Sequence, residues 1–316
     1  MWIESATIAV GLSLYSFVVE PRWFRLRRKS VRLRGSLRRP LEILHLSDFH
    51  YHGSCRYRSR FLKRLAAESV DFIFLTGDLI DVDAGIDPCL EALQHFSPRY
   101  GFYAVLGNHD YLRVTGMDLM RPTGVLPKEK NRRPNDVERL KAGLRRLGIV
   151  VMRNERHIVE VEGIPVTVAG VDDPYLERDD LPATFQGFVK QGPCFVLVHA
   201  PERHLEISEL GADMVFSGHT HGGQVCLPFL GPIITRTTAP RRFAFGLTRE
   251  NGTLFHTTRG IGTGLLSRPR FLCPPEAVVF SAHFTEDENR LEPPLVPDPT
   301  DCLRNPSKSP NPINFK

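Results

Sequence analysis

The chain has 316 residues, of which 41% are hydrophobic and 24% are charged, and its formal net charge is +5. This length is sufficient for one large α/β domain with tails. The six cysteines include no C-x-x-C pair, and Cys194 and Cys226 lie in apolar runs. These features exclude a small disulfide-linked framework and are typical of a protein from a reducing compartment.

The first 39 residues combine an apolar stretch with a basic segment. The stretch 5–19 spans roughly 22 Å as a helix, which is short for a bilayer core of ~30 Å. Residues 21–39 hold nine Lys or Arg and no acid, which leaves the rest of the chain at −4, or +5 minus nine. Because the positive charge follows the apolar stretch, the pattern predicts an uncleaved anchor at an anionic membrane surface, with the body on the cytoplasmic side.

Two alternatives to a membrane anchor remain for this region. One is a buried N-terminal helix of a soluble cytoplasmic protein. The other is a basic arm that binds nucleic acid. The aromatic and aliphatic residues interleaved in the arm, among them Trp23 and Phe24, favour a membrane surface over a duplex.

Five short apolar runs predict buried strands, and each is followed by side chains that bind metals. The runs are 41–46, 71–75, 101–106, 194–198 and 214–216. The side chains after them are, in the same order, Asp48 with His50, Asp78, Asn108 with His109 and Asp110, His199, and His219 with His221. Helical patterns between several runs favour an α/β sheet, where ligands collect at the carboxyl ends of strands. The carboxylate, amide and imidazole groups suit two divalent metals that share a carboxylate.

Glycines precede three of these segments. Gly77, Gly107 and Gly218 each stand directly before a ligand. The chain must turn sharply out of a strand there, and we expect glycine to supply the backbone angles of the turns. The glycine-rich segment 259–264 lacks the strand–helix context of a dinucleotide site and is predicted to lie at the rim of the metal site.

Between the strands, the pattern predicts helices and one long loop. One helix is expected over 57–68 and another over 135–147, with Asn135 as the N-cap and Gly148 at the end. The polar stretch 111–134 begins directly after the site residues, so it must overhang the site.

The expected organisation has three parts. The anchor and basic arm occupy 1–39, and the catalytic domain occupies 40–285. Residues 286–316 are rich in proline and serine without periodicity, which predicts a disordered tail.

The metal-binding segments together resemble a known family. They read D-x-H at Asp48, G-D at Asp78, G-N-H-D at Asn108, a single histidine at His199, and G-H-x-H at His219. This series is similar to that of the calcineurin-like metallophosphoesterases, and with Pro-Pro-Glu at 274–276 the similarity covers most of the chain. The resemblance implies a four-layer α/β/β/α sandwich of two mixed sheets with helices outside and a dimetal site at the strand ends.

The resemblance also implies a role for each ligand. One metal would be bound by Asp48, His50, Asp78 and His221, and a second by Asp78, Asn108, His199 and His219. Asp78 would bridge the two ions, and a hydroxide between them would attack phosphorus. Mn²⁺ is the expected metal, with Fe, Zn or Co as alternatives, because mixed nitrogen and oxygen ligands accept all of them. His109 would contact the phosphoryl group or protonate the leaving oxygen, and Asp110 would orient the imidazole.

Simpler explanations compete with this one. Any single aspartate or histidine after a strand is often an ordinary cap or turn, but five such segments in order are not explained that way. His45 alternates into a predicted strand and is expected in the core. His52 is expected in an exposed loop, with contact to substrate as the alternative. The sequence assigns no substrate-binding residue.

Further features resemble a bacterial, membrane-associated branch of the family. They are the N-terminal hydrophobic segment, the stretch 18–23, and Gly-Gly-Gln-Val after His221. That branch includes enzymes similar to the UDP-2,3-diacylglucosamine hydrolases of lipid A synthesis. The resemblance implies a phosphorylated, lipid-linked substrate, cleaved at a phosphodiester or pyrophosphate bond on the cytoplasmic face of the inner membrane.

The best single substrate candidate is UDP-2,3-diacylglucosamine, which would give UMP and the acylated sugar phosphate. This last step is an analogy between sites. The alternatives are a broad-specificity phosphodiesterase, a protein phosphatase or nuclease, and a metal-binding scaffold without catalysis. Nucleic acid is an unexpected partner, because the body is acidic and carries no evident nucleic-acid module.

Overall fold

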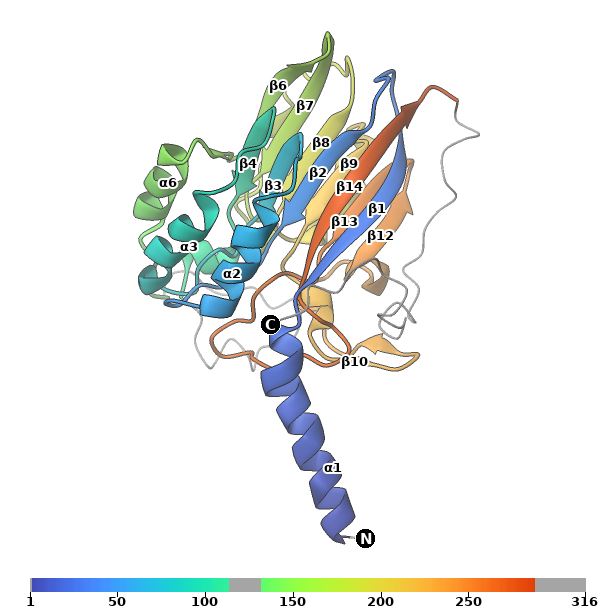
Figure 1. Cartoon of the computed structure of the whole chain (residues 1–316). Coiled ribbons are helices and arrows are strands. Elements are labelled where there is room, and N and C mark those ends of the chain that lie inside the picture. The colour runs from blue at the N-terminus through green and yellow to red at the C-terminus, as the bar shows by residue number, and fades with distance from the viewer. Residues whose placement is uncertain (1, 114–131, 288–316) are drawn as a thin grey trace.

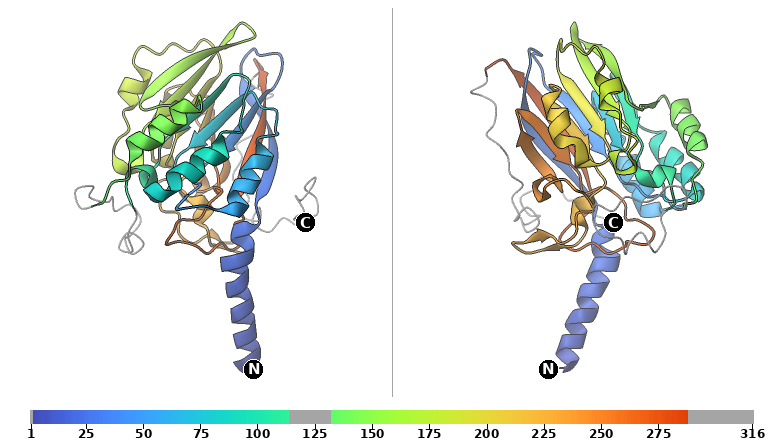
Figure 2. Two further views of the ribbon diagram at one scale, coloured as in Figure 1. Left: turned by 60° about the vertical axis from the view of Figure 1, so that its left-hand side comes forward. Right: turned by 180° about the vertical axis from the view of Figure 1, so that it is seen from behind.

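The structure, a computed structural model, describes residues 2–113 and 132–287. Two six-stranded mixed sheets lie face to face, and helices cover their outer faces (Figure 1). This is the four-layer α/β/β/α sandwich that the resemblance implied. Figure 2 shows the same layers from two other sides.

The first sheet has the order β1-β14-β2-β3-β4-β5. Its strands are β1 (Arg25–Arg34), β14 (Glu276–Thr285), β2 (Leu41–Leu46), β3 (Phe72–Thr76), β4 (Gly101–Val105) and β5 (Val150–Val151). Strands β2 to β5 run parallel, β14 is antiparallel to β2, and β1 is parallel to β14. Three predicted ligand-bearing strands therefore end at one edge of this sheet.

The second sheet has the order β12-β13-β9-β8-β7-β6. Its strands are β12 (Gly246–Glu250), β13 (Thr253–Thr257), β9 (Met214–Ser217), β8 (Cys194–Val198), β7 (Ile164–Val171) and β6 (Glu155–Val161). Strands β13, β9, β8 and β7 are parallel, and the two edge strands are antiparallel to their neighbours. The other two predicted ligand-bearing strands are β8 and β9, at the centre.

Three apolar clusters hold the layers together. Phenylalanines from both sheets fill the space between them: Phe72, Phe74, Phe195, Phe216 and Phe280. The helices α2 (Arg56–Leu65), α3 (Ile86–Leu93) and α6 (Val137–Arg146) pack on the first sheet. The helices α7 (Leu181–Phe185) and α8 (His204–Glu209) pack on the second. Burial on both faces explains why the central strands are continuous apolar runs.

The remaining elements are short. They are α4 (Asn108–Tyr111), the 3₁₀ turns η3 (Asp83–Gly85), η5 (Pro174–Leu176), η6 (Pro201–Arg203), η7 (His221–Gly223) and η8 (Arg241–Phe243), and the hairpin β10 (Cys226–Leu227) with β11 (Gly231–Pro232). Several of these follow a ligand-bearing strand and form the edge that carries the site.

The basic segment differs from the prediction, because most of it is a strand of the domain. Residues Arg25–Arg34 form β1, which pairs with β14 over its whole length. Val31 and Leu33 point into the space between the sheets and are buried, while Arg28, Arg32 and Arg34 on the opposite face are exposed. The alternation matches a half-buried edge strand, so the predicted domain boundary at residue 40 is too late.

The segment before β1 projects from the body. Helix α1 (Trp2–Leu14) continues into a π-helical turn, η1 (Tyr15–Val19), and a 3₁₀ turn, η2 (Glu20–Arg22) (Figures 1 and 2). Residues 7–14 are exposed at every position, so α1 is not the buried helix considered as an alternative. Within residues 2–113 and 132–287, no single helix is long and apolar enough to cross a membrane.

Both predicted helices are present, with one different cap. Asp136, not Asn135, is the N-cap of α6, since its carboxylate accepts from the Arg139 N–H at 3.0 Å. Asn135 instead turns inward toward the metal site. The predicted overhang of 111–134 falls mainly on 114–131, and the predicted disordered tail falls mainly on 288–316, so both lie largely outside the described residues.

Candidate metal centre

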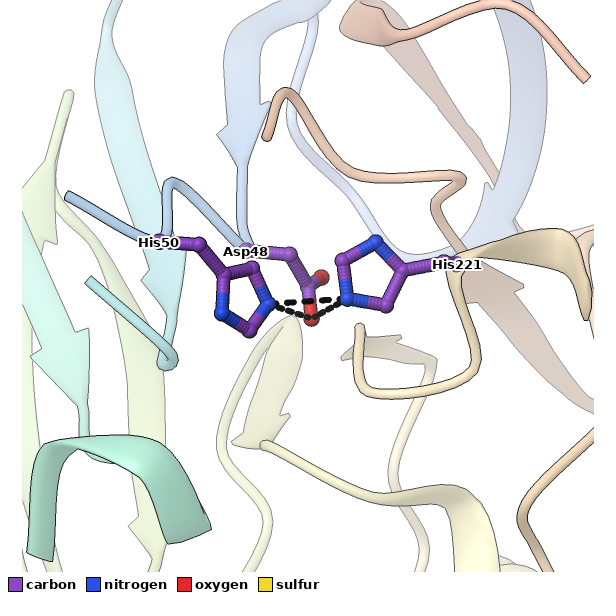
Figure 3. Close-up of side chains that lie close together, drawn as sticks. All are labelled: Asp48, His50 and His221. Atoms are coloured by element: carbon purple, nitrogen blue, oxygen red, sulfur yellow. Dashed lines mark hydrogen bonds and ion pairs between the residues drawn. The ribbon is translucent and has the colours of Figure 1, made fainter. Parts of the chain in front are cut away.

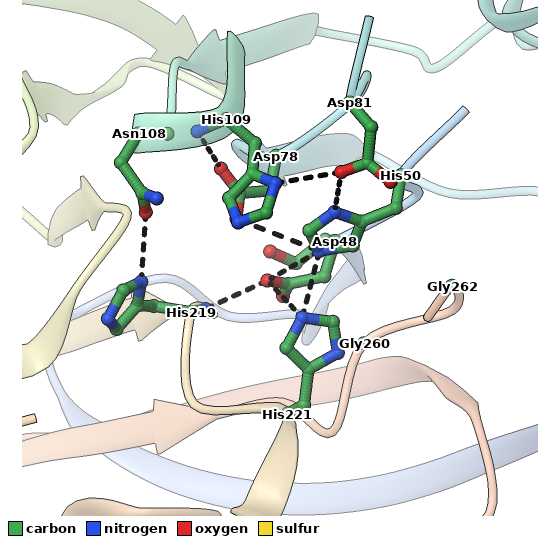
Figure 4. Close-up of polar contacts among 12 residues, drawn as sticks. Asp48, His50, Asp78, Asp81, Asn108, His109, His219, His221, Gly260 and Gly262 are labelled. Carbon is green, nitrogen blue, oxygen red and sulfur yellow. Dashed lines mark hydrogen bonds and ion pairs between the residues drawn. The ribbon is translucent and has the colours of Figure 1, made fainter. Parts of the chain in front are cut away.

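All seven predicted ligands directly follow their strands, at the same edge of the molecule. Figure 4 labels all of them except His199. Asp48 and His50 follow β2, Asp78 follows β3, Asn108 follows β4, His199 follows β8, and His219 and His221 follow β9. The structure brings their side chains into direct contact with one another.

Five of these ligands have a left-handed backbone. The φ angles are 54° for Asp48, 50° for His50, 54° for Asp78, 68° for His219 and 51° for His221. Such angles cost a residue with a side chain on the order of 1 kcal/mol or more, so the surrounding structure must impose them. Backbone bonds do so for the first two, since the His50 N–H donates to the Asp78 carbonyl and the Asp48 carbonyl accepts from Gly262.

The three motif glycines serve two different needs. Gly77 has φ +82°, as expected for a turn that requires glycine. Gly107 and Gly218 do not have positive φ, and there the prediction was wrong. A Cβ on Gly107 would overlap the Asp78 carboxylate, and one on Gly218 would overlap the Asp48 carboxylate. These two glycines make room for ligands.

Asp48, His50 and His221 form the first ligand group (Figure 3). The Nε2 atoms of His50 and His221 are 2.8 Å apart, and His221 Nε2 is 3.4 Å from Asp48 Oδ1. Among the described residues, the buried Asp48 Oδ2 has no hydrogen-bond partner. An orphaned carboxylate oxygen beside two facing ring nitrogens fits a cation, whose ligand atoms each lie ~2.0–2.2 Å from it.

Asp78, His199 and His219 form the second group. Asn108 joins it through its contact with His219 (Figure 4). His199 Nε2 lies 3.3 Å from Asp78 Oδ2, and His219 Nδ1 lies 3.3 Å from His199 Nε2. His219 Nδ1 is also 3.1 Å from Asn108 Oδ1. These four residues are the ones predicted for the second metal.

Asp78 lies between the two groups. Its Oδ2 is 3.6 Å from His50 Nε2 in the first group and 3.3 Å from His199 Nε2 in the second. Its Oδ1 accepts from the backbone N–H of His109 at 2.8 Å, which fixes the rotation of the carboxylate. The arrangement suits a carboxylate shared by two ions.

One carboxylate that the sequence analysis missed, Asp81, holds two histidines (Figure 4). Its Oδ1 accepts from His50 Nδ1 and from His109 Nδ1, each at 2.7 Å, while its Oδ2 accepts from the Leu265 N–H. With Nδ1 protonated, Nε2 of His50 keeps its lone pair toward the site. This is the carboxylate–histidine pairing that commonly orients metal ligands.

Asp110 has a different role from the predicted one. Its carboxylate accepts three backbone N–H groups, from Leu79, Ile80 and Gly107, and does not contact the His109 ring. Asp110 therefore ties the turn after β3 to the turn after β4. The predicted contact with the imidazole is made by Asp81 instead.

Backbone carbonyls hold the two histidines of the second group. His199 Nδ1 donates to the Thr76 carbonyl at 2.7 Å, and His219 Nε2 donates to the Arg236 carbonyl at 3.0 Å. Each bond assigns a proton to the outer nitrogen, so the inner nitrogen is the one that faces the second group.

Arg270 is a second residue that the sequence analysis missed. It is fully buried, and its guanidinium donates to the carbonyls of Arg259, Gly262 and Cys273 at 2.7–2.9 Å. The same guanidinium lies 3.3 Å from His221 Nδ1. It therefore fixes the segment 259–273 around the first ligand group.

These two missed residues differ in how far the sequence could reveal them. Asp81 follows Asp78 by three residues in Gly-Asp-Leu-Ile-Asp, so a second acid near the motif was a usable signal. Arg270 stands in an arginine-rich segment with no local pattern, and only the fold brings it to His221. Asn135 is similar, since its Nδ2 donates to the carbonyls of Asp81 and His109.

The electrostatics of the site favour cation binding. Burial and the neighbouring His199 lower the pKa of His219 to about 3, and burial lowers the pKa of His221 well below its usual range, so both rings are neutral ligands. Burial would raise the pKa of Asp81, but His50 and His109 hold it far below its usual range. His199 behaves oppositely: burial lowers its pKa, yet the nearby carboxylates, chiefly Asp78, raise it overall. A metal must displace that proton, so binding releases protons.

His109 lies beside the metal groups and faces the cavity. Burial lowers its pKa, but the charge of Asp78 and the bond from Asp81 raise it to about 9. Its Nε2 is 3.9 Å from Asp78 Oδ2, and its side chain is 18% exposed. A partly exposed, protonated imidazole next to a metal site can donate a proton to a bound group.

A cavity of about 310 Å³ opens at the metal centre. Its polar wall includes His109, Arg132, Tyr175 and Arg236, and the Tyr175 ring lies 4.6 Å from that of His219. Its apolar wall consists of Val225, Ile233, Ile234, Leu265, Leu266 and Pro269. Gly264 also lines the cavity, so the glycine-rich segment does lie at the rim as predicted.

The isolated histidines are where the sequence placed them. His45 is fully buried in the core, where it contacts His256 and Thr76. His52 is exposed at the surface, with its Nδ1 3.2 Å from the His50 carbonyl.

Comparisons with known proteins agree with this geometry. The chain is 34% identical to the uncharacterized metallophosphoesterase YkoQ of Bacillus subtilis (strain 168), over 60% of this chain and 64% of YkoQ. It is 27% identical to the phosphodiesterase YaeI of Escherichia coli (strain K12), over 87% of this chain and 94% of YaeI. It is 26% identical to the UDP-2,3-diacylglucosamine pyrophosphatase LpxG of Chlamydia trachomatis serovar D, over 75% of this chain and 82% of LpxG.

The family profile of calcineurin-like phosphoesterases matches residues 41–223, a range that contains every ligand from Asp48 to His221. Members of this family are hydrolases that act on phosphoric ester bonds at a dimetal centre. The chain belongs to the calcineurin-like phosphoesterase family.

Proposed function

We propose that this protein is a dimetal-dependent phosphohydrolase that cleaves a phosphodiester or pyrophosphate bond in a membrane lipid precursor. One observation carries the proposal: the cavity at the metal centre has an apolar wall that begins directly beside the ligands. A phosphate would lie at the ligand end, and an apolar group would lie along Val225, Ile233 and Ile234. A soluble, fully polar phosphoester would make no apolar contact with that wall.

The ligands would divide as their contacts suggest. Asp48, His50 and His221 would hold one ion, Asn108, His199 and His219 would hold the other, and Asp78 would contact both. When bound, the two ions supply a water of lowered pKa and neutralise charge on the phosphoryl oxygens. The residue types leave the choice among Mn, Fe, Zn and Co open, with Mn²⁺ as the proposed ion.

His109 would act as the general acid. Asp81 holds its Nδ1, so Nε2 is the nitrogen that faces the cavity and a leaving oxygen. A proton held at Nε2 would pass to that oxygen as the bond to phosphorus breaks. Asp110 would act indirectly, because it keeps the turns that bear Asp78 and Asn108 in register.

The N-terminal helix would be a membrane anchor, with the body on the cytoplasmic face of a bacterial inner membrane. Residues 7–14 cover more than two turns and are exposed on all sides, and most are apolar. A helix that packs against one partner shows a single apolar stripe, whereas a helix in lipid is apolar all round. The exposed Val18 and Val19 extend this surface to the body.

UDP-2,3-diacylglucosamine is the proposed substrate, with UMP and the acylated sugar phosphate as products. The similarity to LpxG supports this choice, since LpxG is named for that pyrophosphatase activity. The similarity to YaeI, named a phosphodiesterase and matched over 94% of its length, supports the alternative of a broader phosphodiesterase. Protein phosphatase, nuclease and non-catalytic scaffold are the remaining alternatives.

The test compares three substrates with the full-length protein in detergent and Mn²⁺. They are bis-p-nitrophenyl phosphate, a UDP-sugar without acyl chains, and UDP-2,3-diacylglucosamine. We expect the acylated substrate to have the highest kcat/KM and to yield UMP, and we expect Asp78→Asn to be inactive on all three. Equal kcat/KM for the two UDP compounds would favour the broad phosphodiesterase. No turnover with two metals bound would favour the scaffold.

A further inference from the structure

Exposed apolar side chains gather at one end of the molecule. Among the described residues, 17 large hydrophobic side chains are exposed, and 13 of them fall into two groups. Seven lie on the N-terminal helix: Ile8, Val10, Leu12, Leu14, Phe17, Val18 and Val19. Six form what we term the apolar rim: Leu227, Phe229, Leu230, Ile233, Ile234 and Leu266. Single exposed hydrophobic residues are ordinary, but a concentration of this size marks an interaction surface.

The tip of the apolar rim is the β10–β11 hairpin. Phe229 is 79% exposed and Leu230 is 59% exposed, in the three-residue loop that joins the two strands. Phe229 also has a left-handed backbone, with φ +63°. A bulky residue in that conformation costs energy, and at this tip no packing within the described structure offsets it.

The rim lies at the base of the N-terminal helix. The Arg270 N–H donates to the Ser16 carbonyl at 2.9 Å, and the Tyr15 ring packs edge-on against Phe271 at 6.1 Å. Phe271 in turn pairs with the hairpin, since its carbonyl accepts from the Cys226 N–H. Figures 1 and 2 show α1 leaving the body next to β10.

The polar groups around this junction suit an anionic surface. Arg22, Arg56 and Arg268 are exposed there, and the Arg22 guanidinium lies over the Tyr57 ring. Trp23 lies under Arg25 at 3.8 Å, directly after the helical segment. Aromatic residues and arginines at this position are typical of the membrane–water interface, where basic side chains are attracted to anionic headgroups.

We propose that the apolar rim is a second membrane-docking surface. Phe229 and Leu230 would insert into the interfacial region of the anionic bilayer that holds the N-terminal helix, so that the mouth of the cavity opens onto the membrane. A bilayer is the occupant because the helix is exposed on all sides, the rim continues its apolar surface, and the exposed Arg22, Arg56 and Arg268 suit anionic headgroups.

This docking gives the rim a role in substrate entry. Ile233, Ile234 and Leu266 belong both to the rim and to the apolar wall of the cavity. An amphiphile could therefore move from the leaflet along one continuous apolar path until its phosphate reaches the ligands. The docking itself does not depend on the reaction, whereas this role in entry rests on the proposed function.

The first test measures contact with lipid in the full-length protein. Phe229→Trp is reconstituted into vesicles of phosphatidylglycerol and phosphatidylethanolamine with brominated acyl chains. Ile158→Trp is the matched control, since Ile158 is 64% exposed on β6, far from the N-terminal helix. We expect bromine to quench the added fluorescence of the first variant and not of the second. Equal quenching of both, or of neither, overturns the docking surface.

The second test measures the consequence for turnover. Phe229→Glu is compared with Ile158→Glu on the lipid-linked substrate in vesicles and on bis-p-nitrophenyl phosphate in solution. Because Phe229→Glu replaces an apolar side chain at the lipid surface with a charged one, we expect it to lower vesicle turnover ~10-fold or more and to leave the soluble reaction unchanged. Equal vesicle turnover by the two variants overturns the role in entry.

The outcomes separate the two proposals. If Phe229→Trp is quenched but no lipid-linked substrate is hydrolysed, the docking stands and the proposed function fails. If the lipid is hydrolysed and Phe229→Trp is not quenched, the function stands and the docking fails. Self-association that Phe229→Glu abolishes, without quenching by lipid, would identify a second copy of the chain as the occupant and overturn the proposal.

Discussion

The two ligand groups differ in what holds their histidines. In the first group, His50 is bonded to the side chain of Asp81, and His221 lies against the guanidinium of Arg270. In the second group, His199 and His219 are bonded to backbone carbonyls. The first group is therefore supported by ionic side chains, and the second by the main chain of the turns themselves.

The difference has physical consequences. A carboxylate raises the basicity of the ring that it holds, and a single substitution can remove it. A carbonyl is neutral, and no side-chain substitution removes it. We therefore expect the first group to depend on its surroundings and the second to depend mainly on the integrity of the fold.

Asp78→Asn should have the largest effect, because the Asp78 carboxylate lies against ring nitrogens of both groups, His50 Nε2 and His199 Nε2. The neutral amide removes a charge that both ions share, and a loss of several kcal/mol of charge stabilisation corresponds to a fall of about 10⁴-fold in rate. Metal content by mass spectrometry and turnover of bis-p-nitrophenyl phosphate check this. Asp213→Asn, which alters a buried carboxylate bonded to Lys190, is the control for charge loss alone. Two bound metals with near-normal turnover would refute the bridging assignment.

His109→Ala should remove the proposed general acid and leave both ligand groups occupied by metal ions. We expect a loss of ~10²–10⁴ in kcat with two metals retained, because general acid catalysis contributes that much. His52→Ala is the matched control, since this exposed neighbour is 3.2 Å from the His50 carbonyl and 3.9 Å from Asp81 Oδ2 but belongs to neither ligand group. Loss of metal by His109→Ala would instead identify His109 as a metal ligand.

Asp81→Asn tests whether the two ligand groups are supported independently of each other. We expect metal affinity to fall about 10–100-fold at the first group and to stay normal at the second, because Asp81 supports His50 and neither His199 nor His219. Titration with Mn²⁺, with each position assigned by anomalous diffraction, measures this. Asp83→Asn, two residues away, serves as the control. Equal weakening at both positions would mean that the groups are not independently supported.

Asn135→Ala should also weaken metal binding more at the first group than at the second, but by a smaller factor. Asn135 donates to the carbonyls of Asp81 and His109, so its loss should weaken the first group within about tenfold and cost ~1 kcal/mol of stability. Asp136→Ala removes the N-cap of the same helix at a similar cost in stability without touching the site. If both variants affect the metals equally, the effect comes from the helix and not from the contact.

Much of the fold followed from local pattern. Central strands buried on both faces are continuous apolar runs, so β2, β3, β4, β8 and β9 were visible in the sequence. An edge strand has one polar face. Because β1 carries so many arginines, its alternating pattern was interpreted as a basic arm and not as a strand. Only its pairing with β14, about 250 residues later in the chain, makes it a strand.

The sequence by itself determined which side chains meet as candidate ligands, because each directly follows a strand and strand ends converge. The tertiary structure alone decided which groups support those ligands. Asp81 rather than Asp110 holds His109, and Arg270 reaches His221 from 49 residues away. It also decided that five ligands adopt left-handed backbones and that two motif glycines serve to make room. Hydrogen-bond partners and steric room depend on distances between segments that are remote in the chain, and those distances exist only once the two sheets have packed.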